Sequence, residues 1–345
     1  MKKYSSILLA AILAMGCLSG CGQKDIADSS DVTMESTETS SETSTENDTD
    51  KLKVVTTIFP EYDWVKQIAG DQADNMDLTL LLDNGVDLHS YQPTAEDIMK
   101  ISDCDLFVYV GGESDGWVDD ALAEAVNQNM QVINLLEVLG DTVKEEEVVE
   151  GMQAEEEEAE EGEEEEPEYD EHVWLSLKNA ETLCNAIASA LEKADPEHTE
   201  DYAENVTSYV DSLKVLDKQY EEAANNASQK TLLFGDRFPF RYLVDDYGLS
   251  YYAAFVGCSA ESEASFETIS FLAKKVDELG LKTVMTIEKS DQKIAKTIIE
   301  NTRDKDQKIL TLDAMQSTTS DDIANGTTYL SVMESNLGVL KEALQ

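Results

Sequence analysis

Basic side chains are scarce in this chain of 345 residues, which has 25 Lys and Arg residues against 73 Asp and Glu residues. The formal net charge is -48 at pH 7, so the surface repels nucleic acid, whose binding needs a basic face. Such a surface attracts cations where its acidic residues are clustered. Histidine is scarcer still, with His89, His172 and His198 as its three representatives.

Long apolar runs are also missing, and the one near the start is too short to span a bilayer comfortably. Residues 1–20 combine the bases Lys2 and Lys3 with an apolar stretch, as a signal peptide does. Cys21 follows Leu-Ser-Gly, a pattern that resembles the bacterial lipobox, where a cysteine receives lipid. A signal peptide with a chance cysteine is the alternative. Residues 21–50 are rich in Ser, Thr and acids, which predicts a disordered tether.

Cysteine is too infrequent for a disulfide framework. Beyond Cys17 and Cys21, the chain has Cys104, Cys184 and Cys258, an odd number that leaves at least one thiol free. Cys104 and Cys184 are expected to be small buried residues. Cys258 follows an apolar run and is a candidate zinc ligand as a thiolate.

Strand-like apolar runs alternate with helix-like stretches in both halves of the chain, which predicts an α/β fold with mostly parallel sheets and covering helices. The expected strands are 52–58, 76–82, 105–111, 131–136, 230–235, 249–256, 282–287 and 308–312. From Thr199 to about Ala227, apolar residues recur every three or four positions along one helix face. At ~1.5 Å per residue this helix would run roughly 40 Å, enough to join two lobes rigidly.

The implied organisation has an N-terminal lobe at 51–177, connecting helices at 178–228 and a C-terminal lobe at 229–345. Between Glu145 and Glu171 lies an insertion with sixteen glutamates and one aspartate. Like charges at this density predict a disordered loop. It is either a solvated spacer or a weak collector of cations beside a tighter site.

His89 and His172 lie in predicted loops at the edge of the sheet, and His172 follows the acidic insertion directly. Two such loops favour a metal site over incidental histidines. His198 follows a proline at a helix start and is expected to be an exposed surface residue. In open α/β sheets, sites gather at the carboxyl ends of strands. Four predicted strands of the second half end near Asp236, Cys258, Glu288 and Asp313.

The stretches "NGVDLHSYQPTAED" and "DEHVWLSLKNA" resemble the metal-binding solute-binding lipoproteins of zinc and manganese ABC importers, in particular the zinc type. The resemblance runs from about Lys51 to the C-terminus. It implies two lobes joined by a long rigid backbone helix, with the metal in the cleft between them. It also implies that His89 and His172 bind the metal and that an ABC permease receives it.

The third and fourth metal ligands of that family cannot be assigned to matching residues of this chain. Arg237 stands at the third position, where its guanidinium cannot coordinate a cation, and the fourth falls near Gln316. Asp236 and Cys258 are possible replacements, although each is individually more typical of a loop cap or a small buried residue. Arg237 could instead pair with Asp236 or Glu261 and close the cleft.

Together with the lipobox-like Cys21, the resemblance implies a monomeric, non-enzymatic, lipid-anchored protein at the outer face of a bacterial cytoplasmic membrane. It would capture zinc and deliver it to a permease. Two imidazoles with a thiolate or carboxylate suit zinc, whereas two imidazoles with two carboxylates would also suit manganese. A manganese-binding member of the family, a metal-dependent adhesin and a metallohydrolase are the alternatives.

Overall fold

A computed structural model of the chain describes residues 51–153, 168–259 and 263–345. The predicted signal peptide (1–20), the tether (21–50), Cys21, Glu261 and the central part of the acidic insertion lie outside these residues. The described residues all belong to one compact unit. Among the described residues, no helix combines the length and the apolar character needed to span a membrane.

The first lobe is built on a four-stranded parallel sheet with the order β2-β1-β3-β4. Its strands are β1 (Leu52–Thr56), β2 (Met76–Leu80), β3 (Leu106–Tyr109) and β4 (Gln131–Asn134). Its helices are α1 (Phe59–Ala69), α2 (Ala95–Asp103), α3 (Val118–Ala123) and α4 (Leu135–Leu139). All four residues of β3 are buried, as expected for a parallel strand covered on both faces.

The second lobe repeats this plan with a parallel sheet of the order β6-β5-β7-β8. Its strands are β5 (Thr231–Phe238), β6 (Ser250–Val256), β7 (Thr283–Ile287) and β8 (Lys308–Leu312). Its helices are α7 (Arg241–Asp246), α8 (Phe266–Leu279) and α9 (Lys293–Asn301). The predicted α/β class with two parallel sheets is therefore confirmed.

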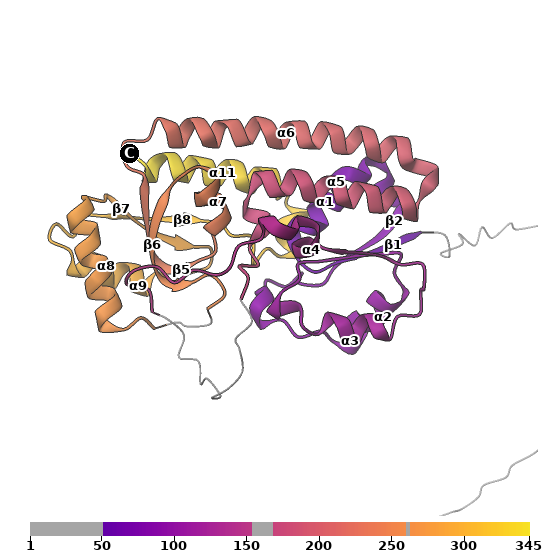
Figure 1. The fold of residues 1–345 in the computed structure, drawn as a ribbon, viewed down its shortest axis with the longest axis horizontal. Helices are drawn as coiled ribbons and strands as arrows, with labels where there is room; N and C mark the ends of the chain where they lie inside the picture. Colours follow the sequence, from indigo (N-terminus) through magenta and orange to yellow (C-terminus); the bar gives the residue numbers. More distant parts are fainter. Residues whose placement is uncertain (1–50, 154–167, 260–262) are drawn as a thin grey trace, which may run out of the picture. The chain divides into compact units, whose positions relative to one another are not determined.

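The predicted long helix is α6 (Thr199–Asn225), which follows α5 (Leu177–Ala194) and links the two lobes (Figure 1). One face of α6 is apolar and buried, including Tyr202, Val206, Leu213 and Tyr220. It packs against α5 and α1 of the first lobe and against the C-terminal helix α11 (Tyr329–Ala343). A helix fixed by packing at several points along its length is a rigid connection.

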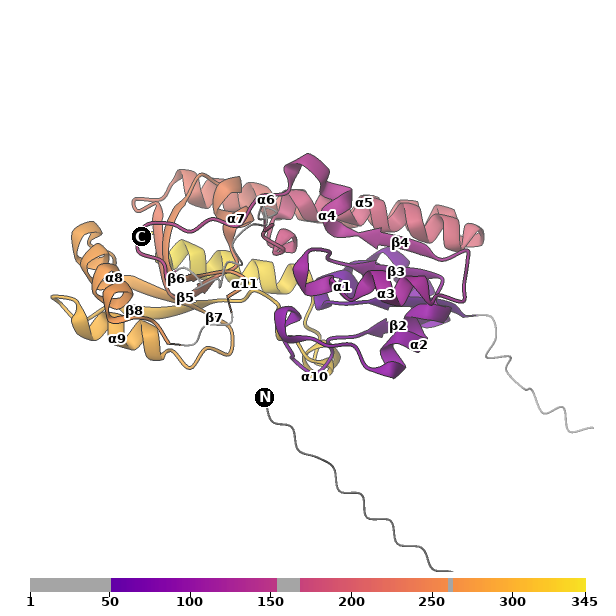
Figure 2. The same cartoon turned by 60° about the horizontal axis from the view of Figure 1, so that its bottom comes forward.

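The chain returns to the first lobe after β8, a crossing that the sequence did not predict. Thr319 forms an antiparallel bridge with Asn84, and the amide of Ser320 donates to the carbonyl of Asp83. The short helix α10 (Ser320–Ala324) begins there, beside the first lobe (Figure 2). The amide of Tyr329 at the start of α11 then donates to Asp63 of α1. The segment 313–328 therefore places residues that follow β8 next to the first lobe.

Short 3₁₀ turns complete the described structure. They span Gly70–Asn75, Leu88–Ser90, Glu113–Asp115, Gly140–Thr142, Val173–Leu175 and Pro196–His198. Cys104 and Cys184 are free and buried, as predicted.

Candidate metal centre

The two predicted ligand histidines meet between the lobes. His89 lies in the 3₁₀ turn Leu88–Ser90 that follows β2, and His172 lies immediately before the turn Val173–Leu175 that leads into α5. Their Nε2 atoms are 3.2 Å apart, and their rings are tilted by 56°. His172 is fully buried, whereas about a tenth of the His89 side chain is exposed.

The Nδ1 atom of each histidine faces a carboxylate. Asp170 Oδ1 lies 2.8 Å from His172 Nδ1 and also accepts from the amide of His172 at 2.9 Å. Around His89 Nδ1 lie Ser114 Oγ at 2.8 Å and Glu171 Oε2 at 3.4 Å. A carboxylate accepts hydrogen bonds, so these contacts favour the Nδ1–H tautomer in both rings. Each Nε2 lone pair then points into the space between the histidines.

Glu171 is held in its charged form although it is buried. Burial acts to raise its pKa, but hydrogen bonds from His89 and Ser114 outweigh this effect and lower the pKa below its usual value. Gly112, with a φ of 84°, leaves room for this carboxylate, because a side chain at that position would collide with it. The acidic pair "DE" directly before His172 is the sequence signal that could have identified these two orienting residues.

Cys258 joins the histidines from the second lobe, where it follows β6. Within the described residues, one group of potential ligand atoms stands out: atoms of His89, His172 and Cys258 all lie within 4.8 Å of one another. Gly257 permits this approach, because an added Cβ would lie 2.9 Å from the His172 ring. Burial raises the pKa of the Cys258 thiol well above its usual value, and nearby carboxylates, Asp170 first, raise it further.

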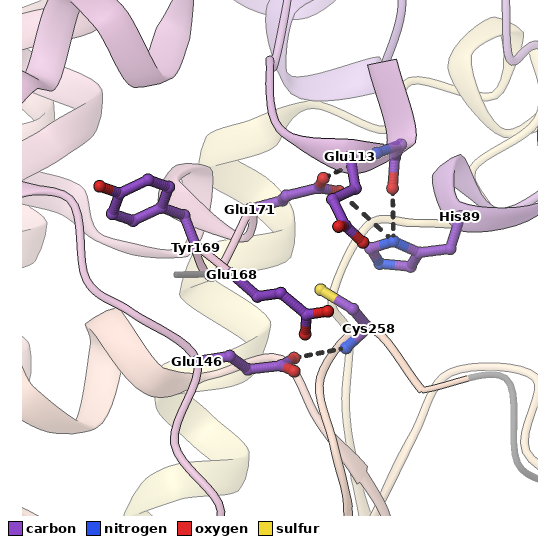
Figure 3. Close-up of a pocket in the computed structure, with 8 residues that line it drawn as sticks. His89, Glu113, Glu146, Glu168, Tyr169, Glu171 and Cys258 are labelled. Carbon is purple, nitrogen blue, oxygen red and sulfur yellow. Dashed lines mark hydrogen bonds and ion pairs between the residues drawn. The ribbon is translucent and has the colours of Figure 1, made fainter. Parts of the chain in front are cut away.

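A cavity of about 250 Å³ opens beside this cluster (Figure 3). His89 and Cys258 face it together with carboxylates from the margins of the acidic insertion and from the Gly-rich loop after β3. Those carboxylates belong to Glu113, Glu146, Glu168 and Glu171. Glu146 Oε1 also accepts from the amide of Cys258 at 3.1 Å. The approach to the cluster is therefore strongly acidic, which favours a cation.

Arg237 and Asp236 lie to one side of this cluster. The alternative that Arg237 pairs with Asp236 is wrong, because its guanidinium forms an ion pair with Asp87 and its backbone amide donates to Asp236. A pairing with Glu261 lies outside the described residues. Asp87 Oδ1 caps the turn that carries His89 by accepting from the His89 amide at 3.1 Å. Asp236 lines a second cavity together with Asp87, Arg237 and Ser290, and it is not part of the ligand group.

The other acidic residues at strand ends have structural partners. Glu288 accepts from the amides of Ala314 and Gln316, and Asp313 accepts from the amide of Met315. His198 pairs with Asp195 at 2.7 Å and lines a different cavity, with about a third of its side chain exposed. Gln316, near which the family's fourth ligand position falls, was not among the predicted ligands. In the structure, its side-chain amide contacts both His89 and His172.

Comparison with known proteins identifies the family of this chain. Residues 54–343 match the family described as "Zinc-uptake complex component A periplasmic" (ZnuA). This chain belongs to that family. The predicted resemblance to zinc-type solute-binding proteins is therefore confirmed.

Several members of the ZnuA family are similar over most of the chain. The "High-affinity zinc uptake system protein ZnuA" of Bacillus subtilis is 33% identical over 296 residues, with 86% of this chain and 88% of that protein covered. The "Zinc-binding lipoprotein AdcA" of Streptococcus pneumoniae is 33% identical and covers 85% of this chain. This chain spans 56% of the length of that protein and of the Streptococcus pyogenes relatives that it matches.

A solved structure supports the same relationship. The Zn(II)-bound ZnuA-like domain of Streptococcus pneumoniae AdcA superposes with a TM-score of 0.66 at 30% identity, covering 85% of this chain and 99% of that domain. The long helix and the two parallel sheets of this chain thus belong to an architecture seen with zinc bound in a relative.

Proposed function

We propose that this chain captures zinc outside the cytoplasm and delivers it to an ABC permease in the membrane. The observation that carries the proposal is the 3.2 Å separation of the His89 and His172 Nε2 atoms, whose lone pairs face the same point. Two nitrogens each about 2.05 Å from a tetrahedral zinc ion lie about 3.3 Å apart. The pair is therefore already spaced for chelation.

The ligand set is His89 Nε2, His172 Nε2 and the sulfur of Cys258. Asp170 holds the Nδ1 atom of His172, and Ser114 Oγ with the Glu171 carboxylate at 3.4 Å faces that of His89. These contacts orient the rings and increase the basicity of the Nε2 atoms. Cys258 loses its proton when the ion binds, because a coordinating thiol binds as the thiolate. Asp236 remains a candidate only if the cleft rearranges, since its carboxylate lies in the neighbouring cavity.

Zinc suits this set better than manganese does. Imidazole and thiolate are preferred by zinc, whereas manganese favours carboxylates, carbonyls and water. Relatives in the same family carry zinc in their names, among them the Bacillus subtilis protein and the pneumococcal lipoprotein. The acidic margin of the cavity then acts as a weak first contact for the cation, which carboxylates alone hold only loosely.

The protein acts as a monomeric carrier at the outer face of the cytoplasmic membrane and not as an enzyme. Lipid on Cys21 would hold it there, with residues 21–50 as a tether. The pneumococcal relative named a lipoprotein supports this anchor. The rigid α6 connection and the contacts between the lobes favour small local movements over a wide hinge during metal release.

Zinc titration of three single-histidine variants by calorimetry tests the proposal. The full chain should bind one zinc ion tightly, and His89→Ala and His172→Ala should each weaken binding by about a hundredfold or more, because each removes one of the chelating imidazoles. His198→Ala is the matched control and should bind zinc with the same affinity as the protein without substitutions. Equal zinc affinity in all three variants would overturn the proposed site.

A further inference from the structure

An ion pair between the two lobes ends on the turn that carries His89. Arg237 is the penultimate residue of β5 in the second lobe, and its guanidinium pairs with Asp87 of the first lobe. The two side chains are 18% and 20% exposed, so both charges are mostly withdrawn from water. Salt screens such a pair less than it screens an exposed one. The contact therefore links the second lobe to the loop that leads into His89.

The two oxygens of Asp87 have separate partners. Oδ2 receives the guanidinium of Arg237, whereas Oδ1 accepts from the backbone amide of His89 at 3.1 Å. The carbonyl of Asp87 also accepts from the amide of Ser90 at 3.0 Å, so this residue caps the 3₁₀ turn Leu88–Ser90. A carboxylate held at both oxygens cannot rotate freely. Arg237 is thus connected to the backbone of His89 through one side chain.

The strands that hold Arg237 also carry Cys258. After a shift in register, Arg237 pairs with Phe255 of β6. That strand ends at Val256, two residues before Cys258. Arg237 and Cys258 therefore lie on the same pair of strands. The ion pair from Arg237 to the turn of His89 thus constrains where the His89 ring lies relative to the sulfur of Cys258.

Contacts on the side of the first lobe orient the His89 ring, but they do not determine how far it lies from Cys258. The Nδ1 atom of His89 faces Ser114 Oγ at 2.8 Å and Glu171 Oε2 at 3.4 Å. These groups would move together with His89 if the lobes shifted. Arg237 reaches across from the second lobe, so its ion pair resists such a shift close to the ligands.

We propose that the Arg237–Asp87 ion pair holds His89 against Cys258 and thereby sets the affinity and the release rate of zinc, an inference that rests on the proposed zinc site. Arg237 is a positioning residue that acts through Asp87 and is not itself a ligand. With the pair intact, ligands from both lobes are in place before the ion arrives, so binding requires less ordering of the chain. When the pair opens, His89 and Cys258 separate and the ion leaves more readily.

The positive charge of Arg237 allows this role to be distinguished from simple electrostatics. A positive charge near a bound cation repels it, so removal of the charge alone would strengthen zinc binding. Loss of the ion pair has the opposite effect, because the ligands of the two lobes are then no longer held together. The sign of the change in zinc affinity when Arg237 is made neutral therefore shows which effect is larger.

Arg237→Gln and Asp87→Asn test this inference by competition with a zinc chelator and by the rate of zinc transfer to an excess of that chelator. Asp87→Asn keeps a side-chain oxygen for the amide of His89 and removes the charge that binds Arg237. Each variant should bind zinc about tenfold more weakly and release it correspondingly faster, as loss of an outer contact of a metal site typically does. Arg237→Lys keeps the charge without the planar guanidinium, so its zinc affinity should fall between that of Arg237→Gln and that of the protein without substitutions.

The double variant and a control complete the design. Asp87→Asn combined with Arg237→Gln should weaken zinc binding no more than the stronger single change, because both single changes break the same contact. Arg303→Gln, at an exposed arginine after α9, removes the same charge and should leave zinc affinity and release rate unchanged.

The outcomes separate this inference from the proposed function. Tighter zinc binding in Arg237→Gln, or losses that simply add in the double variant, would overturn the inference. If both single variants match the protein without substitutions while His172→Ala loses zinc, the ion pair has no such role and the zinc site stands without it. If the protein without substitutions binds no zinc, the inference and the proposed function fail together. Should Arg237→Gln not fold, Arg237→Lys decides: weaker binding at constant charge supports the role of the ion pair, and unchanged binding overturns it.

Discussion

At the scale of single residues, a buried carboxyl near the site predicts a pH dependence of stability. Asp115 is 4% exposed, and burial first, with the charge of Glu171 adding to it, raises its pKa from 3.8 to about 7. Between these values the folded chain keeps a proton that the unfolded chain has lost. The Asp115 side chain therefore lowers the free energy of unfolding progressively as the pH rises from about 4 to 7.

Asp115→Asn should remove this loss, because an amide cannot ionise. Relative to the protein without substitutions, the variant should gain stability as the pH rises through that window, by at most about 1.4 kcal/mol per pH unit, and no further above it. Urea unfolding at several pH values measures the difference. Asp120→Asn, at an exposed position, should show no such trend. Parallel curves for the Asp115 variant and the protein without substitutions would contradict the assignment.

The residues of the site that carry a local signal could be predicted from the sequence. His89 and His172 stand in distinctive motifs, and the structure brings their Nε2 atoms together. The pairing of Arg237 with Asp87, 150 residues away along the chain, could not be predicted. It depends on how the second lobe meets the first, which no short-range pattern encodes. The resemblance placed a family ligand position near Gln316, but the contacts of Gln316 with both imidazoles appear only in the structure.

At the scale of elements, periodicity predicted most of the architecture. The eight expected strands agree with the structure to within a few residues, and α6 ends within two residues of the expected Ala227. Buried parallel strands are continuous apolar runs, and a half-buried helix has a regular apolar face, so both can be recognised in the sequence. The crossing of residues 313–328 has no such pattern, because it is held by scattered contacts such as that of Thr319 with Asn84.

The joint between α6 and α11 offers a test with an internal control. The hydroxyl of Tyr220 donates to the carbonyl of Met333 at 2.6 Å in the buried core. Tyr220→Phe should lower the free energy of unfolding by about 1–2 kcal/mol, because it leaves that carbonyl unsatisfied. Urea unfolding is the measurement.

Tyr209→Phe, on the same helix, is the matched control. Tyr209 is also buried, but its hydroxyl has no hydrogen-bond partner among the described residues. Removing it should leave stability unchanged or raise it slightly, since no bond is lost. A Tyr209 variant as destabilised as the Tyr220 variant would show that the hydrogen bond is not what holds α11 to α6.

At the scale of the whole molecule, the proposed site depends on both lobes. His89 and His172 come from the first lobe and the elements beside it, whereas Cys258 and Gln316 follow strands of the second. The lobes are joined by α6, by the Arg237–Asp87 ion pair and by the return of α11 to α1. The net charge of -48 favours the approach of cations to the whole surface, but only this cluster offers nitrogen and sulfur together within the described residues.

Zinc K-edge X-ray absorption of the full chain loaded with one equivalent of zinc tests this account most directly. We expect the spectrum to show two imidazole nitrogens at about 2.0–2.1 Å from the zinc ion and one sulfur at about 2.3 Å, with oxygen as the fourth ligand. Because the imidazoles come from the first lobe and the sulfur from the second, one spectrum shows whether both lobes bind the ion. A shell of oxygen alone, as the glutamates of the acidic insertion would provide, would contradict the account.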